Sequence, residues 1–388
     1  MIVGVPREIY PGERRVALVP ATVPNLTKAG LQVVVEAGAG AQAGYPDEEY
    51  ASKGAKVVPD RAEVFRTADI VVQVLGHGAN DRTGKADLPL LRREQALIGF
   101  LRPLGSIETV KELAATGVIS FAVELMPRTT RAQSMDALSS MATISGYKGV
   151  LLAADRLPRI FPMLTTAAGT ITPARVLVIG AGVSGLQAIA TSRRLGAVTS
   201  AYDVRPAAKE QVQSLGGRFV ELPIEAKDAQ DARGYARAQD ETFYRQQREL
   251  LGKVVAESDV VIAAAVVPGK KSPVLVPKEM VARMTPGSVI VDLAAERGGN
   301  CELTRTGEIV VEFGVTIVGL VNLGSTVPYH ASQMYSRNLS AFLLHLSKDG
   351  KLQLNLDDEI IRETLLTRGG EIANPRVRDF FKQEVPSS

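Results

Sequence analysis

The sequence of 388 residues contains one cysteine, three histidines and no tryptophan. Because Cys301 is the only cysteine, an internal disulfide is excluded, and this cysteine content fits a reducing compartment. Histidine and cysteine do not recur at the spacings of metal-ligand motifs, so no bound metal is expected. The net charge is only +3 and the basic residues are scattered, which excludes nucleic acid and anionic membrane surfaces as expected partners.

Long hydrophobic runs are also absent. The longest uninterrupted apolar run, Val260 to Val267, is far shorter than the roughly 20 residues that span a bilayer. The N-terminus turns polar at Pro6, Arg7 and Glu8, which is too early for a signal peptide. These features predict a soluble, cytoplasmic chain.

Two series of short apolar runs alternate with amphipathic segments, a pattern that predicts α/β structure on parallel sheets. The first series predicts strands at Ile2–Val5, Gln32–Val35, Asp69–Val74, Ala96–Leu101 and Ile119–Glu124, and helices at Thr22–Ala29, Ile107–Thr116 and Met141–Leu152. The second predicts strands at Val176–Ile179, Ser200–Asp203, Arg218–Leu222, Asp259–Ala264, Val289–Leu293 and Val315–Gly319, and helices at Leu186–Leu195 and over residues 331–346.

The stretch "VLVIGAGVSG" places Gly180, Gly182 and Gly185 in the spacing of a dinucleotide-binding turn. A lone match of this kind is weak, but here it follows an apolar strand and opens a helix, as the chemistry requires. Asp203 ends the next strand and is expected to accept hydrogen bonds from the adenosine ribose, which favours NAD(H) over NADP(H). Arg205 is a candidate cofactor contact, although a surface arginine is the simpler interpretation.

A positioned acid or base is missing. Oxidation of an alcohol or an amine moves a proton as well as a hydride, so enzymes that catalyse it present such a group. None of the three histidines, His77, His330 and His345, lies in an acid/base constellation.

Several motifs resemble alanine dehydrogenase and its relatives, among them "VGVPREIYPGERRVALVPATVPNLTKAG", "VIGAGVSGLQAIATSRRLGA" and "MTPGSVIVDLAAERGGN". The resemblance spans most of the chain. It implies a substrate-carboxylate arginine at Arg15, but it puts Leu75 where the family has a lysine and Arg102 where it has a histidine. A later aspartate is Glu296 here. The loss of the proton-handling pair counts against amino-acid oxidation.

The stretch "PRTTRAQSMDALSS" resembles the signature loop of a second branch, the NAD(H)-binding component (domain I) of proton-translocating nicotinamide nucleotide transhydrogenase. The resemblance implies catalytic-site roles for Arg128, Gln133, Asp136 and Ser139, and for Tyr235 of "GYARA" in a mobile loop at about 221–245. A helix N-cap with solvated arginines accounts for Ser134 or Asp136 alone, but less well for the whole string.

This resemblance implies direct hydride transfer between NAD(H) on this chain and NADP(H) on a partner subunit, in an enzyme that is Si-specific/Re-specific and proton-translocating. Hydride transfer between two nicotinamide rings needs orientation and water exclusion but no base. The expected partners are a second copy, as a homodimer, and an NADP(H)-binding beta subunit with separate membrane subunits of the alpha-2 kind. The chain would then be peripheral at the cytoplasmic face of the inner membrane.

The expected architecture is two Rossmann-like, doubly wound parallel-sheet domains with a nucleotide cleft between them. Residues 1–136 with 331–388 would form the first domain, and 137–330 the NAD(H)-binding domain. Two alternatives stay open: a diverged alanine or amino-acid dehydrogenase, and a non-catalytic NAD(H)-sensing module. The further cofactor contacts that the resemblance implies are Ala181, Val183, Val204, Gly234, Gln247 and Val266.

Overall fold

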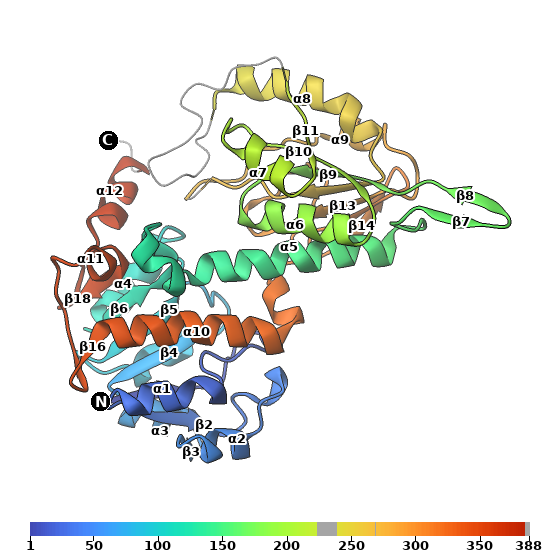
Figure 1. The fold of residues 1–388 in the computed structure, drawn as a ribbon. Helices are drawn as coiled ribbons and strands as arrows, with labels where there is room; N and C mark the ends of the chain where they lie inside the picture. The colour runs from blue at the N-terminus through green and yellow to red at the C-terminus, as the bar shows by residue number, and fades with distance from the viewer. Residues whose placement is uncertain (223–238, 268, 385–388) are drawn as a thin grey trace. The chain divides into compact units, whose positions relative to one another are not determined.

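The computed structural model describes residues 1–222, 239–267 and 269–384. The chain divides into two compact units (Figure 1). Unit 1 comprises Met1–Met141 and Gly324–Ser388, and unit 2 comprises Ala142–Leu323. The C-terminal segment of the chain therefore returns to the unit in which the chain begins.

Unit 1 is built on an eight-stranded sheet in which six consecutive parallel strands follow the order 3-2-1-4-5-6. This is the strand order of a doubly wound nucleotide-binding fold. The returning chain adds two antiparallel strands at one edge. The strands are β1 (Ile2–Val5), β2 (Gln32–Glu36), β3 (Lys56–Val58), β4 (Ile70–Leu75), β5 (Ala96–Phe100), β6 (Ile119–Ala122), β18 (Leu365–Arg368) and β19 (Glu371–Ile372).

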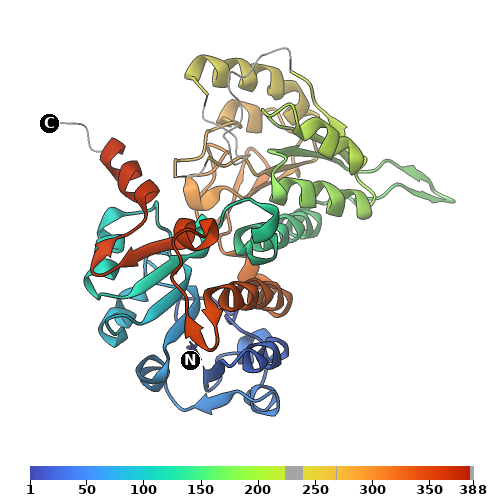
Figure 2. The same cartoon turned by 60° about the vertical axis from the view of Figure 1, so that its left-hand side comes forward.

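Helices of unit 1 begin where the sequence supplies caps. The side chain of Asp60 accepts a hydrogen bond from the backbone of Glu63, and Ser106 does the same for Thr109. The longest helix of this unit, α10, begins at Pro328 and lies beside α1 (Figure 1, Figure 2). The helices are α1 (Val23–Lys28), α2 (Asp47–Ser52), α3 (Arg61–Thr67), α4 (Ile107–Ala115), α10 (Pro328–Leu346), α11 (Glu359–Thr364) and α12 (Pro375–Glu384). Helix α5 (Ala137–Arg156) begins in unit 1 and ends in unit 2.

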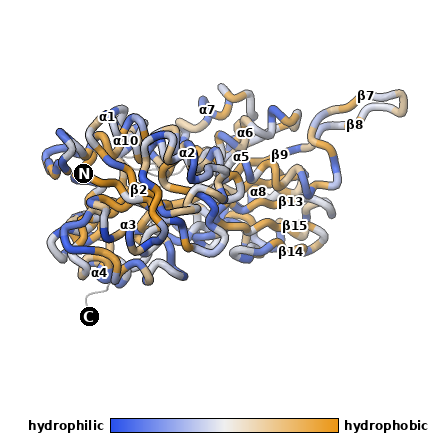
Figure 3. Tube along the Cα trace, turned by 90° about the horizontal axis from the view of Figure 1, so that it is seen from below, coloured by the Kyte–Doolittle hydropathy of each residue, from blue (hydrophilic) through white to orange (hydrophobic). Residues whose placement is uncertain are grey.

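Unit 2 repeats the same strand order, with one antiparallel strand, β14, at its edge. Its strands are β9 (Arg175–Ile179), β10 (Val198–Tyr202), β11 (Arg218–Phe219), β12 (Val260–Ala263), β13 (Val289–Asp292), β14 (Ile309–Glu312) and β15 (Val315–Val318). Its helices are α6 (Val183–Arg194), α7 (Ala208–Ser214), α8 (Glu241–Ala256) and α9 (Lys278–Val281). Hydrophobic residues run along strands such as β13 and β15 (Figure 3), as expected for a sheet covered on both faces.

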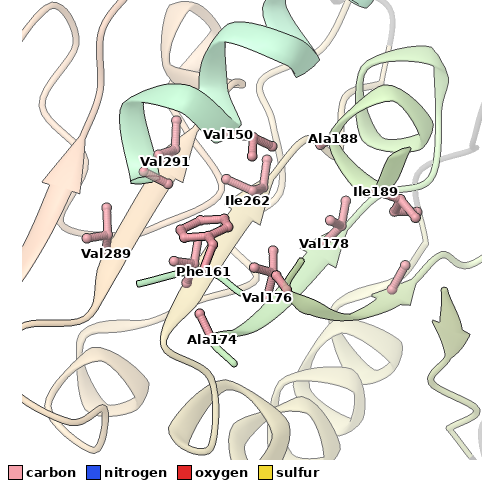
Figure 4. Packing of buried hydrophobic residues seen from close by; sticks show 14 of the residues in the cluster. Val150, Phe161, Ala174, Val176, Val178, Ala188, Ile189, Ile262, Val289 and Val291 are labelled. Carbon is pink, nitrogen blue, oxygen red and sulfur yellow. The ribbon is translucent and has the colours of Figure 1, made fainter. Parts of the chain in front are cut away.

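The two faces of this sheet belong to separate cores. On one face, Val178 and Ile262 pack with Val150 of α5 and Ile189 of α6 (Figure 4). On the other face, the intervening Leu177 packs with residues of α8 and α9. Helices therefore hold the sheet from both sides, which fixes the strand ends where the functional turn lies.

A two-stranded hairpin, β7 (Leu164–Thr166) and β8 (Gly169–Ile171), extends away from the sheet of unit 2 (Figure 1). All six of its strand residues are exposed. The sequence between Ile160 and Ala174 contains no charged residue.

The structure corrects several sequence expectations. The strand expected at Ile119–Glu124 ends at Ala122, because the chain turns into a 3-10 helix at Val123–Leu125. The predicted loop at about 221–245 ends earlier than expected, because Asp240 caps α8 through the backbone N–H of Phe243. Residues 223–238 of that loop lie outside the described residues. The short strands β3, β14, β18 and β19 and the hairpin were not anticipated.

Candidate dinucleotide site and signature loop

The glycine turn joins the end of β9 to the start of α6, as predicted. Gly180 has φ +95°, in the left-handed region that glycine adopts without strain. A Cβ on Gly185 would lie 1.9 Å from the carbonyl oxygen of Gly180. Only glycine at that position lets the first turn of α6 pack against the strand end.

Gly182 is the N-cap residue of α6, with φ −76°. A Cβ built on Gly182 would have no other heavy atom within 4 Å, sequence neighbours apart. The backbone is therefore bare on this side, at the start of a helix whose first N–H groups have no intrahelical partners. This cradle fits a pyrophosphate, since helix N-termini bind phosphate through N–H donors and the helix dipole.

Asp203 follows β10 and is 8% exposed. Four donors occupy its carboxylate: Oδ1 accepts from the backbone N (2.8 Å) and Nε (2.9 Å) of Arg205, and Oδ2 accepts from Ala181 N (2.8 Å) and Arg205 Nη2 (2.9 Å). Asp203 thereby ties the glycine turn to the end of β10. A carboxylate offers about four acceptor positions, so ribose hydroxyls can bind there only if the Arg205 guanidinium yields its place.

Arg205 is therefore not the surface arginine that the sequence suggested. Its side chain is only 15% exposed, pairs with Asp203 through two nitrogens and donates to the carbonyl of Ala181 at 3.2 Å. The hydrogen bonds to Asp203 raise the pKa of Arg205, so the pair is fully charged. The spacing of two residues was the one sequence signal that could have indicated this pairing.

The remaining cofactor candidates of unit 2 lie at different depths. Ala181 is buried, Val183 and Val204 are half-buried, and Val266 is exposed just beyond the end of β12. Gln247 of α8 is 1% exposed and hydrogen-bonds the Tyr202 hydroxyl. Gly234 and Tyr235 lie outside the described residues.

Asn300, which the sequence motifs did not point to, fixes the segment facing Gly180. A Cβ on Gly180 would lie within 3.0 Å of backbone atoms of Ala264 and Ala265. The buried amide of Asn300 accepts from Ala265 N (2.9 Å) and donates to Ala265 O (2.8 Å). Its own backbone N–H donates to Asp292 at 2.7 Å. The turn "RGGNC" after β13 was the signal that could have indicated this support.

The signature loop lies in unit 1 and forms a 3-10 helix, Thr130–Met135, before α5. Asp136 caps α5: Oδ1 accepts from Ser139 N (2.9 Å) and Oδ2 from the Ser139 hydroxyl (2.6 Å). The N-cap interpretation is thus correct for Asp136, and the structure brings Asp136 and Ser139 together. Arg128 and Gln133 are exposed.

The positions that carry the proton-handling pair in alanine dehydrogenases differ here in structure as well as in identity. Leu75 ends β4, and Arg102 has φ +51°, with its backbone N–H donating to Glu124 at 2.6 Å. Arg15 is buried and pairs with Glu13 through Nε (2.8 Å) and Nη2 (2.6 Å). Neither Leu75 nor Arg102 can act as a proton acceptor at neutral pH.

Glu8 is a buried carboxyl that makes the stability of unit 1 pH-dependent. Burial, followed by the charge of Glu13, raises the pKa of Glu8 to about 8, against hydrogen bonds from the backbone N–H groups of Val74 and Leu75 and the charge of Arg61. The folded state then holds a proton that the unfolded chain, with its lower pKa, releases. Stability from this proton is complete below about pH 4.5 and is lost as the pH rises to about 8.

Glu8→Gln is therefore expected to remove part of this pH dependence. The unfolding free energy of the wild type relative to the variant should fall between pH 5 and pH 8 by on the order of 4 kcal/mol at most. Urea denaturation at both pH values measures it. A difference that does not change with pH would contradict the prediction.

Within the described ranges, no cluster of three or more His, Cys, Asp or Glu residues is suited to a metal ion. Burial raises the pKa of Cys301 to about 11, so its thiol is protonated at neutral pH. Among the same residues, no helix has both the length and the apolar character needed to cross a membrane.

Both units match the domains of one family. Residues 4–145 match the N-terminal domain of the alanine dehydrogenase/PNT family, and residues 149–375 match its C-terminal domain. The chain therefore belongs to the alanine dehydrogenase/PNT family, which confirms the predicted resemblance and the predicted Rossmann-like α/β fold.

Within this family, the chain is similar to an NAD(P) transhydrogenase subunit alpha protein of Rhodospirillum rubrum, with 45% identity over 378 residues that cover 97% of this chain and 98% of that protein. It also resembles the structure of a transhydrogenase from Sinorhizobium meliloti, with a TM-score of 0.83, 41% identity and coverage of 97% and 100%. An L-alanine dehydrogenase structure has a TM-score of 0.81 at 26% identity, with coverage of 99% and 100%. These relatives support an NAD(H)-binding role within an oxidoreductase family.

Proposed function

We propose that this chain is the NAD(H)-binding component of a proton-translocating transhydrogenase. The observation that carries the proposal is an intact dinucleotide turn, bare at Gly182, in a chain whose Leu75 and Arg102 cannot accept a proton. A dehydrogenase with these two residues lacks an acceptor for the proton that accompanies the hydride. A transhydrogenase needs none.

In this proposal, unit 2 binds the dinucleotide. The first N–H groups of α6 and the bare backbone at Gly182 hold the pyrophosphate. Asp203 accepts hydrogen bonds from the adenosine ribose once Arg205 gives up its place, and its charge opposes a 2′-phosphate. Val183, Val204, Gln247 and Val266 remain predicted contacts, as does Gly234.

The residues of the signature loop act on the nicotinamide end. Bound NADH supplies a hydride from C4 of its ring to NADP⁺ on a partner domain, without exchange of a proton. Asp136 and Ser139, already paired, offer an acceptor and a hydroxyl to the carboxamide. Arg128 and the exposed amide of Gln133 orient the nucleotides, and Tyr235 joins them from its own segment. Their contribution is orientation and exclusion of water.

The proposed partners are an NADP(H)-binding subunit and membrane subunits that couple transfer to proton movement, which would hold the chain at the cytoplasmic face of the membrane. The NAD(P) transhydrogenase relatives support this aspect of the proposal.

A second copy of the chain is a further proposed partner, as a homodimer. The uncharged hairpin, whose Met163, Leu164 and Ile171 are 63%, 44% and 52% exposed, supports it. Two such hairpins can pair without charge repulsion. Sedimentation equilibrium distinguishes this dimer from a monomer.

The test of the function is hydride transfer from NADH to an NADP analogue, with this chain mixed with a transhydrogenase NADP(H)-binding domain. Alanine with NAD⁺, without the partner domain, is the parallel assay. Transfer in the mixture alone is the expected result. Turnover of alanine without a partner would instead support the amino-acid dehydrogenase, and NADH binding without either reaction would support a sensing module.

A further inference from the structure

The C-terminal segment of unit 1 contacts the signature loop at two points. The side-chain amide of Asn338 in α10 donates to the carbonyl oxygen of Ser134 at 2.8 Å. The guanidinium of Arg131 forms an ion pair and hydrogen bond with the carboxylate of Asp358. Asn338 is 7% exposed, and the Asp358 side chain is 17% exposed. Residues more than 200 positions away thus contact the 3-10 turn on both sides of Gln133.

Asp358 is itself held in place. Its Oδ1 accepts from the backbone N–H of Ile360 at 2.8 Å, which caps α11, and lies 3.3 Å from His345 Nε2. Burial would raise the pKa of Asp358, but the hydrogen bonds from Ile360, His345 and Arg131 bring it below its usual range. The carboxylate is therefore charged at neutral pH and bound on three sides, so it can act as a fixed point for Arg131.

The two contacts fix backbone positions and leave the Gln133 side chain exposed. Hydride transfer between two rings depends on geometry alone, and a misplacement of about 1 Å can cost about 100-fold in rate. A short 3-10 turn has poor hydrogen-bond geometry of its own and gains rigidity from such outside contacts.

We propose that Asp358 and Asn338 are positioning residues for hydride transfer, which hold the turn Thr130–Met135 so that Gln133 is presented in one orientation. This inference rests on the proposed function. Neither side chain touches the nucleotide in this proposal. Both act through the backbone or the arginine of the loop.

Asp358→Asn is the sharpest test, because asparagine caps a helix about as well as aspartate but cannot form the ion pair with Arg131. We expect its turnover of NADH-to-NADP-analogue transfer to fall by about 3- to 10-fold, with KM for NADH changed by less than about 2-fold. Arg131→Gln should match it, and the double variant should be no slower than Asp358→Asn, because the two changes remove one interaction. Asp60→Asn, at the N-cap of α3, is the matched control and should leave transfer unchanged.

Asn338→Ala removes the second contact and should also lower turnover more than it raises KM. The melting temperature and the NADH dissociation constant are measured for every variant. Unchanged turnover in Asp358→Asn and Asn338→Ala, with an active wild type, would overturn the inference alone. Losses that follow the melting temperature or NADH binding would also overturn it, since they indicate a structural role. An inactive wild type would overturn the proposed function and this inference with it.

Discussion

Gly182→Ala is expected to lower the affinity for NADH by about 30- to 100-fold, or about 2 to 3 kcal/mol, without unfolding the protein. Alanine adopts the φ of −76° at this position, and its Cβ would meet no other atom within 4 Å, sequence neighbours apart. The methyl group would instead stand where the pyrophosphate approaches the backbone. Because the chain contains no tryptophan, NADH fluorescence can be titrated without transfer from that residue.

Gly185→Ala is the matched contrast. Its Cβ would lie 1.9 Å from the carbonyl oxygen of Gly180, so the start of α6 would have to move. We expect this variant to lose stability, by about 1 to 3 kcal/mol, as well as affinity. Equal NADH affinity in the wild type and Gly182→Ala would show that the pyrophosphate does not use this cradle.

Gln133→Leu is expected to slow hydride transfer by about 100-fold while the dissociation constant for NADH changes by less than about 3-fold. The side chain is exposed, so its replacement by an apolar group of similar size should not alter the fold. Single-turnover transfer with the NADP(H)-binding domain separates the chemical step from binding. Gln42→Leu, an exposed glutamine of the same unit, is the control.

Asp136→Asn extends the same prediction to the nicotinamide end, because asparagine preserves the cap of α5 but removes the charge. Transfer at the wild-type rate in both Gln133→Leu and Asp136→Asn would exclude the roles assigned to this loop. A loss of transfer with intact NADH binding would support them.

The elements of the fold that sequence predicted best are the buried parallel strands. Ile2–Val5 was placed to the residue, because a strand covered on both faces reads as a continuous apolar run. The glycine turn was predictable because each glycine answers a steric demand of the backbone, such as the approach of Gly185 to Gly180. Strand β14 was missed because its exposed, alternating residues resemble a surface segment.

Contacts between distant segments of the chain could not be predicted from patterns. The pairing of Arg131 with Asp358 joins residues separated by 227 positions, and no periodicity relates them. The capping role of Asp136 was visible as an alternative, because it depends on Ser139 three residues ahead. The pairing of Arg205 with Asp203 depends on a side-chain orientation that composition does not encode.

The repeated strand order has a consequence for ligand stoichiometry. In unit 2 the crevice between the first and fourth strands of the order, β9 and β12, carries the glycine turn. In unit 1 the corresponding strands are β1 and β4, and there the chain continues with Pro6, Arg7 and Glu8 instead. The Glu8 side chain fills this edge by accepting from Val74 N (2.6 Å) and Leu75 N (3.1 Å) at the end of β4. An acidic side chain thus takes the donors that a phosphate would need, so a protein with two nucleotide-binding topologies is expected to saturate at one dinucleotide per chain.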